Sequence, residues 1–191
     1  MARLVFVSHP EVVVDPQVPV ERWHLSDGGI ARMRHFAARD EVRDVSAVWA
    51  STETKAIEAA GILAARLGLG LQTLRALGEN DRSSTGFLPP PEFEAVADAF
   101  FAEPETSVRG WERAVDAQSR ILDAVRSIAA QHRGGDLAVV AHGAVGSLLH
   151  CALAGRPISR GADQPWQGHF WCATLPDLQP LHGWRSIAPR E

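Results

Sequence analysis

The sequence predicts an α/β protein, a three-layer α/β/α sandwich with a mostly parallel central sheet. Short apolar runs rich in β-favouring residues alternate with longer segments in which apolar residues recur at helical spacing. This alternation is typical of parallel sheets, because a helix usually connects two parallel strands. The length of 191 residues corresponds to one ordinary domain of roughly 100–200 residues. We therefore expect a single domain that spans residues 1–191.

The strand predictions depend on short apolar runs that stop at polar or turn-forming residues. The first run, residues 4–7, ends shortly before Pro10, because proline cannot donate a hydrogen bond to a central ladder. The most clearly buried run, residues 136–141, follows a pair of glycines and ends at His142. In chain order, the predicted strands cover residues 4–7, 46–50, 71–77, 136–141, 170–175 and 181–187.

The helix predictions depend on apolar spacing and on capping residues. Ser26 or Asp27 can cap the first helix, and Gly68 can close the second in a left-handed conformation. Between residues 93 and 101 the aromatic residues fall on one stripe, which indicates packing rather than a stacking platform. Five helices are predicted. The first begins near Ser26 and the second after Thr52, and the other three cover residues 93–101, about 111–131 and 144–154.

Composition and charge exclude several classes of function. The net charge of −4 provides no electrostatic footprint for nucleic acid or for an acidic membrane surface. No apolar run approaches the roughly 20 residues of a membrane span, and the amino terminus lacks a signal-peptide pattern. Cys151 and Cys172 lack metal-ligand spacing and lie in apolar surroundings, which favours buried free thiols in a reducing compartment over a disulfide. We expect a cytoplasmic protein without a metal site.

Two predicted strands end at histidines, His9 and His142. If both strands are central and parallel, the imidazoles lie side by side at the edge where open α/β sheets hold their ligands. The helix after the second strand brings Lys55, the only lysine, to the same edge, and the loop after the third strand brings Glu79. Helix amino termini at this edge add partial positive charge. The pattern favours an anionic ligand.

Five short segments also follow one another in a recognisable order between residues 3 and 154. They are Ser8-His9-Pro10, Leu25-Ser26-Asp27-Gly28-Gly29, Ala50-Ser51-Thr52-Glu53-Thr54-Lys55-Ala56, Leu77-Gly78-Glu79 and Ala141-His142-Gly143. They resemble, in this order, the Arg-His-Gly, Leu-Thr-x-x-Gly, Ser-Pro-Leu-x-Arg-Ala, acidic-loop and Ser-His-Gly elements of the histidine phosphatase, or phosphoglycerate mutase-like, superfamily. Each segment alone is unspecific, but the ordered set identifies the chain as a divergent member of this superfamily.

The resemblance implies roles for the residues at this edge. His9 would be the nucleophile that forms a phosphohistidine, and Glu79 would act as general acid and then as general base. His142 and Lys55 would stabilise charge on the transferring oxygens, with Gly143 as a further phosphate contact. Asp81 is near enough to Glu79 in sequence to compete for the acid role. The resemblance implies neither a cofactor nor a metal.

The sequence departs from the superfamily pattern at its phosphate contacts. Ser8 stands in place of the motif arginine, Pro10 in place of the motif glycine, and Lys55 in place of a second arginine. A serine hydroxyl offers one neutral hydrogen bond where a guanidinium offers charged and often bidentate ones. Arg82, three residues after Glu79, could enter the pocket as a substitute, or it could simply face solvent.

Two functional hypotheses follow. The chain is a phosphatase that acts on a small phosphorylated metabolite through a phosphohistidine at His9, or it is a catalytically weakened relative that binds a phosphorylated or other anionic ligand. A mutase is the weaker alternative, because the segment after Glu79 supplies no basic lid for a diphosphate. Substrate choice would depend on the loops around residues 12–25 and 78–91. The sequence leaves the oligomeric state open, a homodimer included.

Overall fold

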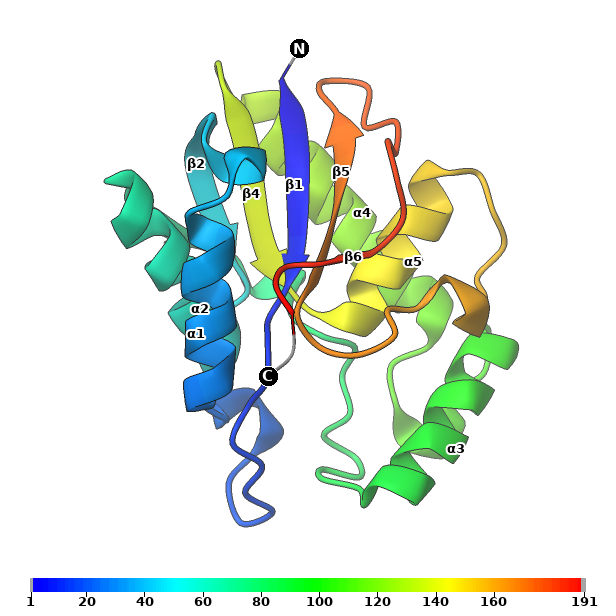
Figure 1. The fold of residues 1–191 in the computed structure, drawn as a ribbon. Coiled ribbons are helices and arrows are strands. Elements are labelled where there is room, and N and C mark those ends of the chain that lie inside the picture. The colour runs from blue at the N-terminus through cyan, green and yellow to red at the C-terminus, as the bar shows by residue number, and fades with distance from the viewer. Residues whose placement is uncertain (1, 190–191) are drawn as a thin grey trace.

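The computed structural model describes residues 2–189 and contains a mixed, mostly parallel sheet of six strands (Figure 1). The strand order is β3-β2-β4-β1-β5-β6. The pairs β1–β4, β2–β4 and β2–β3 are parallel, whereas β5 and β6 are antiparallel additions at one side. The strands are β1 (Arg3–Ser8), β2 (Val45–Ala50), β3 (Leu71–Thr73), β4 (Asp136–Ala141), β5 (His169–Thr174) and β6 (Arg185–Ser186).

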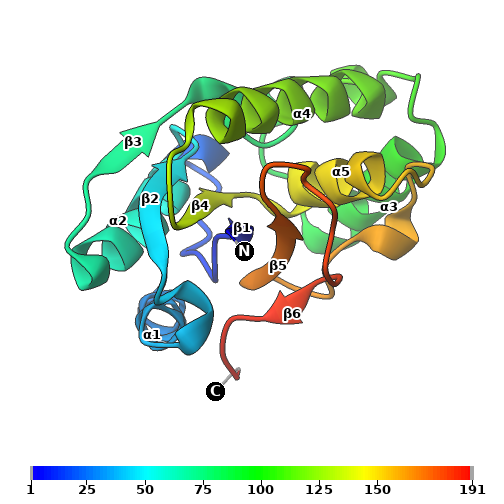
Figure 2. The same ribbon diagram turned by 90° about the horizontal axis from the view of Figure 1, so that it is seen from above.

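Helices cover both faces of the sheet, which confirms the predicted three-layer α/β/α sandwich (Figure 2). One layer consists of α1 (Asp27–Ala37) and α2 (Thr54–Leu67). The opposite layer consists of α4 (Ala114–Gln131) and α5 (Gly143–Leu153). The remaining helix, α3 (Pro90–Ala102), lies on the α5 side, beyond the carboxyl ends of β1 and β4 (Figure 1). Among residues 2–189, no helix is both long and apolar enough to cross a membrane.

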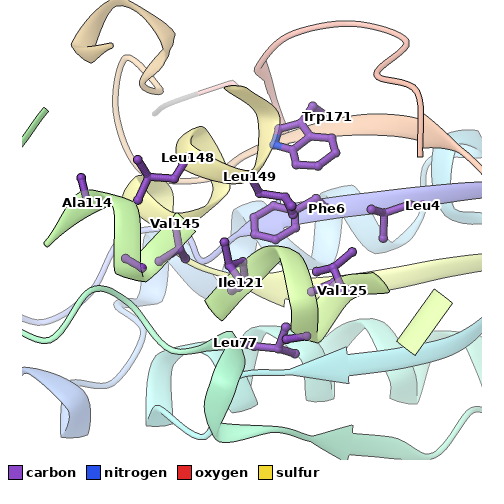
Figure 3. Close-up of a cluster of buried hydrophobic side chains, with 14 of the residues drawn as sticks. Leu4, Phe6, Leu77, Ala114, Ile121, Val125, Val145, Leu148, Leu149 and Trp171 are labelled. Atoms are coloured by element: carbon purple, nitrogen blue, oxygen red, sulfur yellow. The ribbon is translucent and has the colours of Figure 1, made fainter. Parts of the chain in front are cut away.

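Alternate residues of the central strands divide the core between the two layers. Leu4 and Phe6 belong to the cluster under α4 and α5, whereas Val5 and Val7 belong to the cluster under α1 and α2. Because successive side chains of a strand point to opposite faces, a continuous apolar run serves both layers at once. Figure 3 shows the first cluster, in which the Phe6 ring stacks on Trp171 with the ring centroids 5.0 Å apart.

Three predicted elements differ in extent from the structure. The third strand ends at Thr73 rather than at residue 77, because a 3-10 turn over Arg75–Leu77 turns Leu77 into the core beneath α4. Helix α4 begins at Ala114 rather than near residue 111, because Arg113 is extended and residue 111 already packs as part of the core. The last strand is only Arg185–Ser186, which pairs with β5 at the margin of the sheet.

Candidate active site

Two hydrogen bonds align the ends of the three central strands. The His9 amide donates to the Ala141 carbonyl oxygen at 3.0 Å, and the Ser51 amide donates to the Val140 carbonyl oxygen at 3.2 Å. These bonds continue the parallel ladders one residue beyond the ends of β1 and β2. The structure therefore brings the first residues after β1, β2 and β4 to one edge of the sheet, where the sequence places the predicted site.

His9 is buried and lies beside His142, with ring centroids 5.3 Å apart and the rings inclined by 69°. Its Nδ1 is 2.8 Å from the Pro10 carbonyl oxygen. Because that oxygen can only accept a hydrogen bond, the neutral ring carries its proton on Nδ1 and leaves a lone pair on Nε2. Burial, together with the charge of Lys55, lowers the pKa of His9 to about 4. The ring is therefore neutral near pH 7, as a nucleophilic imidazole must be.

His142 is fully buried between the ends of β4 and β2. Its Nε2 is 2.7 Å from the Ser51 hydroxyl oxygen and 3.2 Å from Glu53 Oε1. Burial lowers the pKa of His142 well below its ordinary value. Its Nδ1 is one of four buried side-chain nitrogens without a hydrogen-bond partner among residues 2–189, and the Asn80 side-chain nitrogen next to Glu79 is another. Unpaired buried polar groups are uncommon and often mark functional sites.

Glu79 lies at the amino terminus of α5. Its Oε1 accepts hydrogen bonds from the amides of Val145 and Asn80, both at 3.1 Å, and its Oε2 accepts one from the Ala144 amide at 3.3 Å. Burial raises the pKa of Glu79 above its ordinary value. Asp81 has a different environment: it is exposed and accepts a hydrogen bond from the Ser83 amide within a local turn. Of the two carboxylates, Glu79 is the less exposed and is held by three backbone amides, and its raised pKa suits a general acid.

Lys55 is buried at the start of α2 and points its ammonium group toward a carboxylate. Its Nζ donates to Glu53 Oε2 at 2.5 Å and to the Val20 carbonyl oxygen at 2.8 Å. Burial opposes ionisation of Glu53, but His142, Lys55 and the Glu79 amide together lower the pKa of Glu53 to about 2. Glu53 was not among the predicted site residues, although an acidic residue two positions before the only lysine, where the motif has leucine, was a usable signal.

Ser8 is fully buried and connects β1 to the segment before β5. Its hydroxyl donates to Gln164 Oε1 at 2.5 Å and accepts from the His169 amide at 3.0 Å. The Gln164 side chain also covers Gly143, where a Cβ would lie 2.2 Å from Gln164 Nε2. The structure thus places Ser8 and Gly143 against Gln164, a residue that no sequence signal indicated.

Arg82 lies over the rings of Phe93 and Trp111, with its guanidinium carbon 5.2 and 5.6 Å from the ring centroids. It lines a cleft of about 1090 Å³ together with Glu53 and Glu79. Its positive charge also acts on the protonation of His9, His142 and Glu79. Arg82 therefore contributes positive charge to the candidate site from the cleft side.

The cleft is bordered by the two loops that are predicted to determine substrate specificity, those around residues 12–25 and 78–91. Residues 16–21 line the cleft, and so do most of residues 74–87. Both loops extend beyond the carboxyl ends of β1 and β4 (Figure 1), and Trp23 and Phe87 bring them into contact with ring centroids 5.8 Å apart. Within residues 2–189, no cluster of three or more His, Cys, Asp or Glu side chains could hold a metal ion.

Comparison with known proteins places the chain in a family. The family model described as the histidine phosphatase superfamily (branch 1) matches residues 16–172. The chain belongs to the histidine phosphatase superfamily. The matched range includes the positions of Lys55, Glu79 and His142 and begins after His9. No curated protein matches the sequence significantly.

Solved structures show the same histidine phosphatase fold at low sequence identity. The YhfR protein of Bacillus stearothermophilus is 20% identical with a TM-score of 0.82, and the match covers 100% of this chain and 99% of that one. A mycobacterial glucosyl-3-phosphoglycerate phosphatase is 19% identical with a TM-score of 0.78, and the match covers 97% of this chain and 96% of that one. A phosphoserine phosphatase of Entamoeba histolytica, solved with 3-phosphoglyceric acid, is 12% identical with a TM-score of 0.76, covering 97% and 98%.

Proposed function

We propose that this protein is a phosphatase that hydrolyses a small phosphorylated metabolite through a phosphohistidine at His9. The observation that carries the proposal is the buried, neutral imidazole of His9, whose Nδ1 faces the Pro10 carbonyl oxygen at 2.8 Å and so leaves Nε2 as a nucleophile. Structural relatives named as phosphatases of glucosyl-3-phosphoglycerate and of phosphoserine support a small phosphomonoester as the substrate class. We expect the reaction to need neither a metal nor an organic cofactor.

The reaction divides into two displacements. In the first, Nε2 of His9 attacks phosphorus, the bond to the leaving oxygen breaks, and Glu79 gives its proton to that oxygen. In the second, Glu79 takes a proton from water as the water oxygen attacks the phosphohistidine, which releases phosphate and restores His9. The raised pKa of Glu79 supports this exchange. Lys55, Arg82 and the amino terminus of α5 would stabilise the charge on the transferring oxygens.

Replacement of His9 by alanine tests the proposal. We expect H9A to lower phosphate release from p-nitrophenyl phosphate by about 10³-fold or more, because the nucleophile is lost. Wild-type protein quenched during turnover with a radiolabelled phosphomonoester should carry an acid-labile label that H9A lacks. H35A is a matched control, because His35 lies exposed on α1, and it should keep wild-type activity. Equal rates for wild type and H9A would refute the proposal.

A second candidate function is binding of a phosphorylated or anionic ligand without efficient turnover. Two observations favour it: the Ser8 hydroxyl is already engaged by Gln164 and His169, and the Lys55 ammonium is already paired with Glu53. Thermal stabilisation by inorganic phosphate, without phosphate release from any of a panel of phosphomonoesters, would support this candidate. Robust turnover by the wild type would exclude it.

A further inference from the structure

We propose that Glu53 occupies the anion-binding position of the candidate site and competes with the phosphoryl group for Lys55 and His142. The inference deepens the proposed function and relies on it, and it takes Lys55 and His142 as phosphate contacts, as the superfamily resemblance implies. In the superfamily motif leucine precedes the arginine by two residues, whereas here glutamate precedes Lys55 by two. An apolar side chain is thus replaced by an anion beside the phosphate position.

Three donors from different parts of the chain converge on the Glu53 carboxylate. Lys55 Nζ lies 2.5 Å from Oε2, the Glu79 amide nitrogen lies 2.9 Å from Oε1, and His142 Nε2 lies 3.2 Å from Oε1. An ammonium, a backbone amide and an imidazole are also the donors that a phosphate group uses in proteins. The carboxylate therefore satisfies the same groups that a bound phosphoryl oxygen would need.

Glu53 cannot stay in place when a phosphoryl group enters. The Lys55 side chain is 3% exposed and the Glu53 side chain is 12% exposed. Solvent therefore screens the electrostatic interactions of these two charges only weakly. A phosphate dianion beside an ionised carboxylate would be repelled, and the single ammonium cannot neutralise both. The Glu53 carboxylate and a phosphoryl group therefore compete for the Lys55 ammonium and do not bind it together.

The position of Glu53 in the fold allows its carboxylate to move. Glu53 is the N-cap residue of α2, but its side chain makes no capping hydrogen bond to that helix. It also lines the cleft of about 1090 Å³. Rotation of the side chain can therefore carry the carboxylate into the cleft without breaking a hydrogen bond that begins the helix.

Glu53 also affects the protonation of His142. Because a carboxylate only accepts hydrogen bonds, the neutral ring that faces Glu53 at Nε2 carries its proton there, and the unpaired Nδ1 then offers a lone pair. The same Nε2–H that faces the carboxylate is the donor that a phosphoryl oxygen would use. When Glu53 leaves, Nε2 keeps its proton, and its hydrogen bond becomes available to phosphate.

Binding of inorganic phosphate to wild type, E53Q and E53A, measured by isothermal titration calorimetry at pH 7, tests the inference. We expect about tenfold tighter binding by E53A and a smaller gain for E53Q, which keeps the shape but loses the charge. E21Q is the matched control: Glu21 lines the same cleft, whereas the Lys55 ammonium bonds to Glu53 and Val20 and the His142 Nε2 faces Ser51 and Glu53. The affinity of E21Q should stay within about threefold of wild type.

Unchanged or weaker phosphate binding by both Glu53 variants, or no detectable binding by any of the proteins, would overturn the inference and make Glu53 a residue that only orients Lys55. Circular dichroism verifies that each variant is folded. If E53A does not fold, the comparison of E53Q with wild type is sufficient for the test. Because the measurement needs no turnover, the result is separate from the phosphatase proposal. A wild type without turnover whose E53Q variant binds phosphate more tightly would refute that proposal and support this inference.

Discussion

At the scale of single residues, the site holds neighbouring ionisable groups in different protonation states. Burial and the charge of Lys55 lower the pKa of His9 to about 4, and burial raises that of Glu79. Glu53 stays ionised, because its cationic and hydrogen-bonding neighbours outweigh its burial and lower its pKa to about 2. A neutral imidazole beside a carboxyl group of raised pKa is the combination that the proposed phosphohistidine mechanism needs.

These pKa values predict the pH dependence of kcat/KM. His9 must be neutral and Glu79 protonated, so activity should fall below about pH 4 as His9 gains a proton. It should also fall above the raised pKa of Glu79 as that group loses its proton. We expect an acid limb near pH 4 rather than near the ordinary histidine value of 6.5. A pH profile measured with two substrates of different phosphate pKa separates enzyme ionisation from substrate ionisation.

E79Q provides the control for this assignment. It should lower kcat by about 10²–10⁴-fold for a substrate with a poor leaving group, and by less for p-nitrophenyl phosphate, whose leaving group needs little protonation. The alkaline limb should disappear from the E79Q profile. An alkaline limb that persists in E79Q would assign it to a different residue.

At the scale of elements, the amino terminus of α5 organises much of the site. Its amides at Ala144 and Val145 hold the Glu79 carboxylate, and His142 immediately precedes its first residue. Gly143 lets the Gln164 side chain lie against this terminus while Gln164 Oε1 accepts the Ser8 hydroxyl. The helix thereby links the ends of β1 and β4 to a segment far along the chain.

Replacement of Gly143 by alanine should destabilise the protein by about 1–3 kcal/mol, because the new Cβ would lie 2.2 Å from Gln164 Nε2 and displace a side chain tied to Ser8. Urea unfolding measures the change. G61A is the matched control: Gly61 lies within α2 with no atom near its Cβ position, and alanine there should stabilise by up to about 1 kcal/mol. If Q164A does not relieve the cost of G143A, the clash is not its cause.

At the scale of the whole molecule, one sheet carries two packed layers, and the central strands contribute to both. Phe6 points into the α4 and α5 layer, where it is fully buried against Trp171, and Met33 of α1 is fully buried in the other layer. Since Val5 and Val7 lie on the same strand as Phe6 but face the α1 and α2 layer, loosening of one layer also disturbs the other. We expect the chain to unfold as one cooperative unit.

Phe6→Ala and Met33→Ala test this expectation from opposite faces. Each should lower the free energy of unfolding by about 2–5 kcal/mol, because each leaves a cavity in a packed layer. Far-UV circular dichroism and tryptophan fluorescence should report the same midpoint for each variant. V14A serves as a control, since Val14 is 55% exposed and its replacement should change stability by less than about 0.5 kcal/mol. Two separate transitions would show that the layers unfold independently.

Elements were predictable from the sequence where their signals lie within a few neighbouring residues. The strands β1 and β4 and the helices α1 and α2 were predictable, because apolar runs, Ser26 and Gly68 carry their information within a few residues. Residues 75–77 and 111–113 were predicted as strand and helix, and tertiary packing overrode that preference by burying Leu77 and Trp111 in other conformations.

The sequence by itself determined the fold, the superfamily resemblance and the placement of His9 and His142 at one edge, because strand polarity follows from the order of strands and helices. Only the tertiary structure decided which side chains face each other there. Ser8 meets Gln164 across 156 residues, and Glu53 faces both Lys55 and His142. Contacts of this kind depend on how the layers pack and on the need of each buried charged or polar group for a partner. No local sequence pattern encodes them.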